Sequence, residues 1–347
     1  MDSEREGIIL LLGVTGAGKS YFINQLKKKG PVTERPVREG HTLCSREYLI
    51  HWKHRQERQH SYQTSRCQLV QMVLEDDDGD ERSISVVDTP GFDDTERPDG
   101  EVLAEITEFL ATQHALGIPL KGVLYLHKIT DNRMTGSSGT YLRLLQSLIG
   151  DSAMANVVLV TTMWYMLRDE YEGEGLRRQT QLSEKYWKSL TEKGAGVTKF
   201  EGTPESAWSI VRKLAPKEPV VLDYQRQVIE EGRDLIRTNA GNSLLQKLES
   251  TKVEYSIRLK DLEDQHDEAI AIGDKAVARD KEREISEAQD VLRRIDKSVA
   301  KLGAQPGPRI KEGVARAMKG QAAGRAVTVL AAILNITLFV VQLVVGV

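Results

Sequence analysis

The chain has 347 residues, of which 48 are basic and 51 acidic, so its formal net charge is only −3. Abundant, nearly balanced charges favour exposed helical surface over a nucleic-acid-binding face, and we expect no nucleic-acid partner. The presence of only two cysteines argues against a disulfide framework, and the lack of an N-terminal apolar stretch preceded by basic residues argues against a secretory signal. We therefore expect an intracellular protein with a water-soluble body and more than one folded unit.

The first predicted element is a buried strand over residues 7–12, which runs into Gly-Val-Thr-Gly-Ala-Gly-Lys-Ser at residues 13–20 and then into a helix over residues 19–29. This order is typical of a phosphate-binding loop, in which glycines let backbone N–H groups converge on phosphate oxygens. Lys19 is expected to reach the terminal phosphates, and Ser20 to ligate magnesium. A glycine-rich turn with an incidental lysine is the weaker alternative. The predicted nucleotide contacts here are Gly13, Thr15, Gly16, Ala17, Gly18, Lys19, Ser20 and Tyr21.

A basic, histidine-containing segment follows, for which we predict a switch I insertion. Thr42 is the best candidate for its magnesium-sensing residue, with Ser45 as the alternative. His51 and His54 could share a helical face, but no paired Cys-x-x-Cys motif supports a zinc site.

Two strands are predicted next, over residues 66–74 and 83–88, with the acidic tip 76–80 as a solvated hairpin turn between them. The second strand delivers Asp88-Thr89-Pro90-Gly91 at its carboxyl end, where α/β sheets place their ligands. Asp88 is expected to hold magnesium through water, and the Gly91 N–H to approach a γ-phosphate.

Together, the phosphate loop and Asp88-Thr89-Pro90-Gly91-Phe92 resemble the septin-like branch of GTPases, which includes immunity-associated nucleotide-binding (GIMAP-type) proteins and chloroplast import receptors. Residues 126–134 and 159–164 resemble related fungal G-domain proteins. The resemblance covers about the first 215 residues. It implies GTP or GDP with Mg²⁺ as cofactors, and a nucleotide-controlled switch that dimerises, often at a membrane.

Helices and strands continue to alternate up to Pro219, which predicts an α/β, doubly wound P-loop GTPase sheet for the domain 1–219. The remaining predicted elements are a helix over 100–115, a strand over 121–127, a helix over 137–149, a strand over 156–162, a helix over 176–193, a strand over 197–200 and a helix over 204–213.

Several positions depart from the GTPase pattern. Phe92 stands where many small GTPases carry a water-orienting glutamine, so slow hydrolysis is expected unless a partner supplies groups in trans. Arg133 is the candidate for that role, with an ordinary surface arginine as the alternative. After the strand over 156–162 the chain reads Thr162-Met163-Trp164-Tyr165, so a neutral residue replaces the guanine-reading aspartate and discrimination for guanine is not assured. Thr162 and Trp164 are predicted nucleotide contacts, although Trp164 equally fits a core position.

Beyond Pro219 the pattern predicts a helical or coiled-coil extension over 220–304. A four-three apolar repeat runs from Ile285 to Leu302, while residues 264–284 are too polar for a strong seam. This pattern favours either a hairpin of two helices or an interrupted coiled coil. It fits packing onto the G domain and pairing between chains equally well.

The C-terminal part is predicted as a hinge and basic segment over 305–325, followed by a hydrophobic transmembrane helix over 326–347. These last 22 residues carry no charge, and as a helix they would be long enough to cross a bilayer with the basic flank on the cytoplasmic side. Asn335 and Gln342 favour the alternative of a buried helix or an oligomer seam.

The sequence thus predicts a GTP-binding switch protein on the cytoplasmic face of an intracellular membrane. Its slow hydrolysis would depend on homodimerisation through the G domain or the extension. The alternatives are a membrane-active protein gated by its nucleotide domain, and an NTPase that prefers another base.

Overall fold

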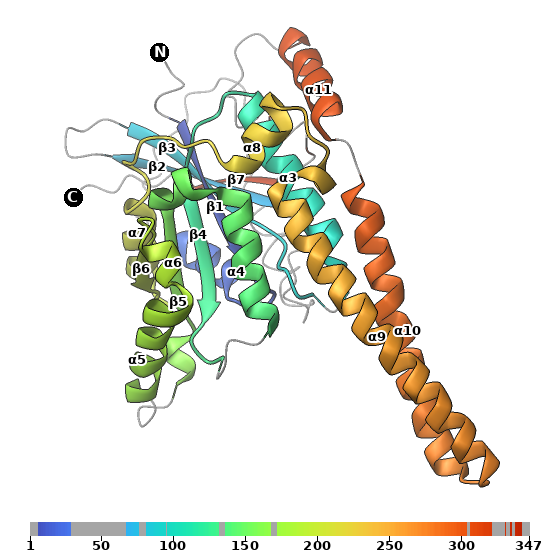
Figure 1. Ribbon diagram of the computed structural model, residues 1–347. Helices are drawn as coiled ribbons and strands as arrows, with labels where there is room; N and C mark the ends of the chain where they lie inside the picture. The colour runs from blue at the N-terminus through green and yellow to red at the C-terminus, as the bar shows by residue number, and fades with distance from the viewer. Residues whose placement is uncertain are drawn as a thin grey trace, which may run out of the picture.

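The computed structural model describes residues 6–28, 67–75, 81–94, 96–131, 136–167, 172–303 and 306–320, together with residues 330, 334 and 337–341 of the tail. In these residues seven strands form one mixed sheet in the order β6-β5-β4-β1-β3-β2-β7 (Figure 1). The strands are β1 (Glu6–Gly13), β2 (Gln68–Glu75), β3 (Glu81–Asp88), β4 (Leu120–Lys128), β5 (Val157–Thr162), β6 (Gly196–Lys199) and β7 (Thr337–Val341).

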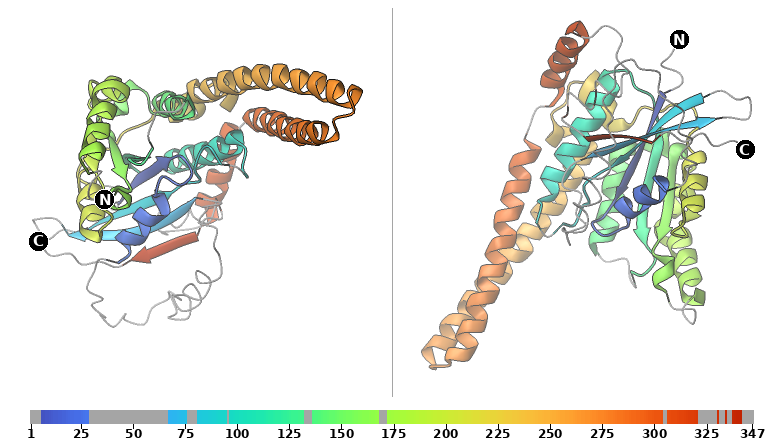
Figure 2. Two further views of the ribbon diagram at one scale, coloured as in Figure 1. Left: turned by 90° about the horizontal axis from the view of Figure 1, so that it is seen from below. Right: turned by 180° about the vertical axis from the view of Figure 1, so that it is seen from behind.

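The central strands are buried because helices cover both faces of the sheet. Residues 8–12 of β1 are at most 2% exposed, as a continuous apolar run in a parallel sheet requires. On one face lie α1 (Lys19–Leu26) and α7 (Pro204–Arg212), which contact each other. On the other face lie α3 (Asp99–Ala115) and α4 (Gly136–Ile149) (Figure 2).

Among the strands that the structure describes, the pairing of β2 with β3 is antiparallel and every other pair is parallel. The antiparallel register joins Glu75, the last residue of β2, to Glu81, the first residue of β3, as the predicted hairpin requires. The connecting residues 76–80 lie outside the described part of the chain.

The single helix predicted over 176–193 is interrupted. It consists of α5 (Glu172–Gln181), a π-helical turn η5 (Leu182–Tyr186) and α6 (Lys188–Thr191). The Trp187 N–H donates to the Leu182 carbonyl, five residues back, at 2.7 Å. The extra residue in this turn directs Trp187 into the core, where it is fully buried with its ring 5.9 Å from that of His127.

Short helical segments also lie within the domain and in the chain that leads from α7 to the extension. They are η2 (Asp151–Asn156), η3 (Trp164–Met166), α8 (Asp223–Gln225), η6 (Arg226–Glu230) and η7 (Leu235–Arg237).

The extension is an antiparallel helical hairpin made of α9 (Asn239–Ala271) and α10 (Lys275–Leu302). The turn between them contains Gly273 in a left-handed conformation at φ +77°. Near the domain, α9 packs on α4 and α10 packs on α3, while the far half of the hairpin projects freely (Figure 1). The structure thus contains the hairpin rather than an interrupted coiled coil, and its base is folded onto the G domain. A further helix, α11 (Pro306–Gly320), follows.

The predicted transmembrane helix over 326–347 is wrong as a continuous helix. Residues 337–341 form β7, which pairs in parallel with residues 68–72 of β2. The sequence Thr-Leu-Phe-Val-Val is rich in β-branched and aromatic residues, which favour strands, and the outer edge of β2 offers backbone groups that need partners. Across the described ranges, no helix combines the length and apolarity needed to cross a membrane.

Candidate nucleotide-binding site

The loop after β1 has the backbone geometry of a phosphate cradle. Gly16 and Gly18 have φ values of +77° and +89°, which glycine adopts without strain. A Cβ atom on Gly13 would lie 2.6 Å from the Leu126 carbonyl oxygen, so the loop begins in close contact with β4. Helix α1 starts at Lys19, and its N-terminal N–H groups therefore face the loop.

The side chain of Lys19 is buried and reaches back to the first residues of this loop. Its ammonium group donates hydrogen bonds to the carbonyls of Gly13 and Val14, both at 3.0 Å. Burial lowers the pKa of Lys19 to about 8, while the nearby carboxylates of Asp88 and Asp94 oppose the shift. The charge of Lys19 is therefore held inside the loop by neutral carbonyls and two nearby acids.

Ser20 and Asp88 meet beside Lys19. The Ser20 hydroxyl donates to Oδ2 of Asp88 at 2.9 Å, although the residues come from α1 and the end of β3. The Thr89 hydroxyl fixes the start of the following segment by donating to the Leu11 carbonyl at 2.7 Å. A hydroxyl and a carboxylate are hard oxygen ligands, so this pair fits Mg²⁺. Thr42, the third predicted metal ligand, lies outside the described residues.

The segment of residues 91–94, hereafter the switch segment, lies directly on the phosphate loop. The Thr15 N–H donates to the Phe92 carbonyl at 2.7 Å, and the Thr15 hydroxyl to Oδ2 of Asp94 at 3.2 Å. A Cβ atom on Gly91 would lie 2.5 Å from the Thr15 backbone nitrogen, so only glycine fits there. Asp94 was not among the predicted site residues. The one sequence signal for it is the acidic pair that follows Phe92.

At the other end of the loop, Thr162 supports the backbone. Its hydroxyl lies 2.9 Å from the Ala17 carbonyl oxygen and 3.2 Å from that of His127, so it ties the loop to β4 and β5. The Tyr21 hydroxyl donates to the Gly202 carbonyl at 3.1 Å, and its ring lies beside those of Tyr165 and Phe200.

Trp164 is 7% exposed, its indole N–H donates to the Thr161 hydroxyl at 3.0 Å, and the Lys199 ammonium lies 4.6 Å from its ring centroid. This is the arrangement of a core tryptophan. Stacking on a base would require Lys199 to leave the ring, and it stays a prediction. Tyr165, at the position of the guanine-reading acid, is 59% exposed. Arg133 lies outside the described residues.

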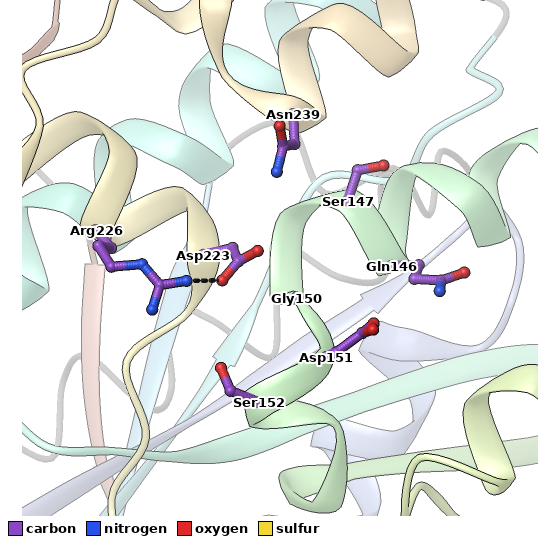
Figure 3. A pocket seen from close by; sticks show the side chains of 8 residues that line it. All are labelled: Gln146, Ser147, Gly150, Asp151, Ser152, Asp223, Arg226 and Asn239. Atoms are coloured by element: carbon purple, nitrogen blue, oxygen red, sulfur yellow. Dashed lines mark hydrogen bonds and ion pairs between the residues drawn. The ribbon is translucent and has the colours of Figure 1, made fainter.

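A polar depression also lies at the end of α4, far along the chain from the phosphate loop (Figure 3). Asp223 and Arg226 form an ion pair there. Its lining residues are Gln146, Ser147, Gly150, Asp151, Ser152, Asp223, Arg226 and Asn239. It shares no residue with the phosphate loop or the switch segment.

Residues 8–132, which contain the loop, β3 and the switch segment, match the family model of 50S ribosome-binding GTPases. The chain contains a P-loop GTPase domain. The match ends before β5 and β6, so it does not cover the base-reading positions, and the septin-like subtype stays a prediction.

Solved structures of P-loop GTPases give weaker likenesses. Toc33 from Arabidopsis thaliana with Mg²⁺ and GMPPNP is 18% identical, covers 57% of this chain and 72% of its own, and has a TM-score of 0.37. The structure of the same protein with GDP and Mg²⁺ is 17% identical. The match covers 63% of this chain and 88% of the Toc33 chain, with a TM-score of 0.42. A chain of the signal recognition particle receptor SRb-GTP/SRX complex from Chaetomium thermophilum is 16% identical. The match covers 56% of this chain and 88% of that chain, with a TM-score of 0.31. No curated protein matches this chain.

Proposed function

We propose that this protein is a molecular switch that binds GTP and GDP with Mg²⁺ and hydrolyses GTP slowly. The observation that carries the proposal is the convergence of Lys19, Ser20 and Asp88 at a glycine loop that opens a helix. Lys19 neutralises the β- and γ-phosphates, and the N–H groups of the loop bind their oxygens. Ser20 and Asp88 hold Mg²⁺, which offsets the phosphate charge when bound.

Slow hydrolysis follows from Phe92. Its ring stacks on Tyr141 at a centroid distance of 5.4 Å, and an apolar ring can neither accept nor donate a hydrogen bond that orients water. We therefore propose that turnover is low in the monomer and rises when two nucleotide faces meet, because a partner then supplies the missing polar group. Arg133 is the proposed donor.

The base preference is a separate part of the proposal. The domain match favours GTP, whereas Tyr165 offers no acid to pair with the guanine edge. An adenine-binding or unselective NTPase is the alternative that this one residue favours, because a missing hydrogen-bond partner removes most of the discrimination between bases.

The test is calorimetric titration of the full chain with GTP, GDP and ATP, with Mg²⁺ and with EDTA. Lys19→Ala should abolish binding of all three nucleotides. Lys28→Ala, a change of an exposed lysine in the turn after α1, should leave binding unchanged. Asp88→Ala should weaken binding more with Mg²⁺ than with EDTA. Unchanged affinity in Lys19→Ala would overturn the site, and tighter binding of ATP than GTP would favour the alternative.

Attachment to a membrane by the tail is a separate proposal, and it has no support from the described residues. Because residues 337–341 pair with β2, the same residues cannot also span a bilayer as a helix while that pairing persists. Fractionation of cells that express the full chain and a chain without residues 326–347 tests it. A full chain that stays soluble without detergent would contradict it.

A further inference from the structure

The switch segment is held from two sides. On its inner side lie the three contacts with Thr15 described above. On its outer side lies the α9–α10 hairpin. The Arg294 guanidinium of α10 donates a hydrogen bond to the backbone carbonyl of Asp94, across 200 positions of sequence.

The second outer contact passes through Asp99, the first residue of α3. The Lys247 ammonium of α9 donates to Oδ2 of Asp99 at 2.8 Å, and Oδ1 of Asp99 accepts the Asp93 N–H at 3.1 Å. Tyr141 braces this pair: its hydroxyl donates to Asp99 at 2.7 Å, and its ring lies 4.0 Å from the Lys247 ammonium while stacking on Phe92. Each helix of the hairpin thus fixes one part of the switch segment.

Asp93, whose N–H is one of these two attachment points, has a left-handed backbone with φ +61°. Such a conformation is costly for a residue with a side chain and persists only where its surroundings hold it. Asp99 and, through Asp99, Lys247 of the hairpin are among the groups that hold it, together with the Tyr141 hydroxyl, which donates to Oδ1 of Asp93 at 3.4 Å.

The arrangement opposes a γ-phosphate. The Asp94 carboxylate lies against Thr15 and helps to stabilise the charge of Lys19, the group that reaches the β- and γ-phosphates in such loops. Two anions beside one lysine repel each other, and the contact of Gly91 with Thr15 closes the space between loop and switch segment. A nucleoside diphosphate, which lacks the last phosphoryl group, meets less of this opposition.

We propose that the α9–α10 hairpin is an autoinhibitory clamp, in which Lys247 and Arg294 hold the switch segment and its Asp94 carboxylate on the phosphate loop and so disfavour the triphosphate relative to the diphosphate. This inference rests on the proposed nucleotide site, because it concerns how the hairpin regulates nucleotide binding at that site. Because binding coupling is reciprocal, a bound triphosphate loosens the hairpin base by the same factor that the hairpin weakens triphosphate binding. Anything that draws the hairpin away then switches the domain to its triphosphate form.

The experiment compares the affinities of the full chain for GDP and for a non-hydrolysable GTP analogue. Lys247→Met, Arg294→Gln and Asp94→Asn should each shift the affinity ratio toward the analogue by about tenfold, the scale of one hydrogen bond to a charged group. Asp94→Asn preserves size, but it removes the negative charge and turns one acceptor oxygen into an amide donor, so it tests the contribution of the carboxylate to the clamp. Lys252→Met and Arg293→Gln are the matched controls. Their partners are Asp296 and Asp290 within the hairpin, and their ratios should stay at the wild-type value.

Hydrogen exchange provides a readout that does not depend on any variant folding well. Amides of residues 291–299 in α10 should exchange faster with the analogue bound than with GDP bound. Equal exchange in both states, or an unchanged affinity ratio in all three variants, would overturn the clamp while leaving the nucleotide site intact. Wild-type protein that binds neither nucleotide would instead refute the site itself, and the clamp with it.

Discussion

Lys19 carries its charge where burial opposes it, and two carbonyl oxygens and two nearby carboxylates compensate for this burial. Its position followed from the spacing of the glycines around it, because a left-handed turn at Gly16 and Gly18 is encoded locally. The same holds for Asp88, which a strand delivers to a known edge of the sheet. Asp94, Asp99 and Lys247 could not be assigned from the sequence, because their roles arise from contacts between residues as far apart as 99 and 247.

Nucleotide binding should take up a proton at alkaline pH. With a pKa of about 8, Lys19 is roughly 10% protonated at pH 9 and about 90% protonated at pH 7. Bound phosphates favour the ammonium form and raise this pKa, so affinity should fall as the pH rises through about 8. Calorimetry in two buffers with different ionisation heats should detect uptake of nearly one proton at pH 9 and almost none at pH 7. Binding at pH 9 without proton uptake would show that Lys19 keeps its charge in the free protein.

Thr162 should act on the loop rather than on the base. Thr162→Val keeps the shape but loses the hydroxyl beside the Ala17 and His127 carbonyls, which should cost about 1 kcal/mol of stability. The urea midpoint should fall, and the affinities for GTP and ATP should fall by the same factor. Thr162→Ser, which keeps the hydroxyl, is the control. A loss confined to one of the two nucleotides would instead make Thr162 a base-reading residue.

At the level of elements, local patterns predicted most of what forms. The strands of the sheet core and helices α3, α4 and α7 lie within a residue or two of their predicted bounds. The exceptions depend on tertiary packing. The π-helical turn before Trp187 forms because a large ring has to reach the core, and residues 337–341 extend because an open strand edge is available. The polar stretch over 264–284 proved to be the free end of the hairpin.

The α9–α10 hairpin contacts α3 at Gly100. A Cβ atom on Gly100 would lie 2.2 Å from the Ser298 carbonyl oxygen, so the backbones of α3 and α10 touch there. Gly100→Ala should force them apart and cost about 1–3 kcal/mol of stability.

The matched control is Gly139→Ala in α4, where an added Cβ would meet nothing within 4 Å. That variant should gain about 0.5–1 kcal/mol, because alanine favours a helix. Chemical denaturation measures both changes. Equal effects in the two variants would mean that the contact between α3 and α10 contributes nothing to stability.

At the scale of the whole molecule, the edge strand of the mixed sheet next to β2 is β7, which comes from the C-terminal part of the sequence. Deleting residues 326–347 removes β7 and exposes the backbone groups of β2 at residues 68–72. We expect a lower melting temperature and more self-association, since an uncovered edge pairs readily with other chains. Thermal unfolding and light scattering on the full and shortened chains provide the measurement. A shortened chain that is equally stable and monomeric would show that β7 covers no vulnerable edge.

Because residues 337–341 close the sheet, the timing of synthesis matters. By the time α7 ends at Arg212, strands β1 to β6 have been made, and the ribosome must add about 125 more residues before Thr337 is reached. At about 5–20 residues per second this takes roughly 6–25 s, during which the outer edge of β2 lacks its β7 partner. The nascent protein therefore passes through an interval in which the P-loop domain is largely built but still open along one edge. That interval is when a chaperone has most reason to bind it and when neighbouring nascent chains are most prone to pair wrongly.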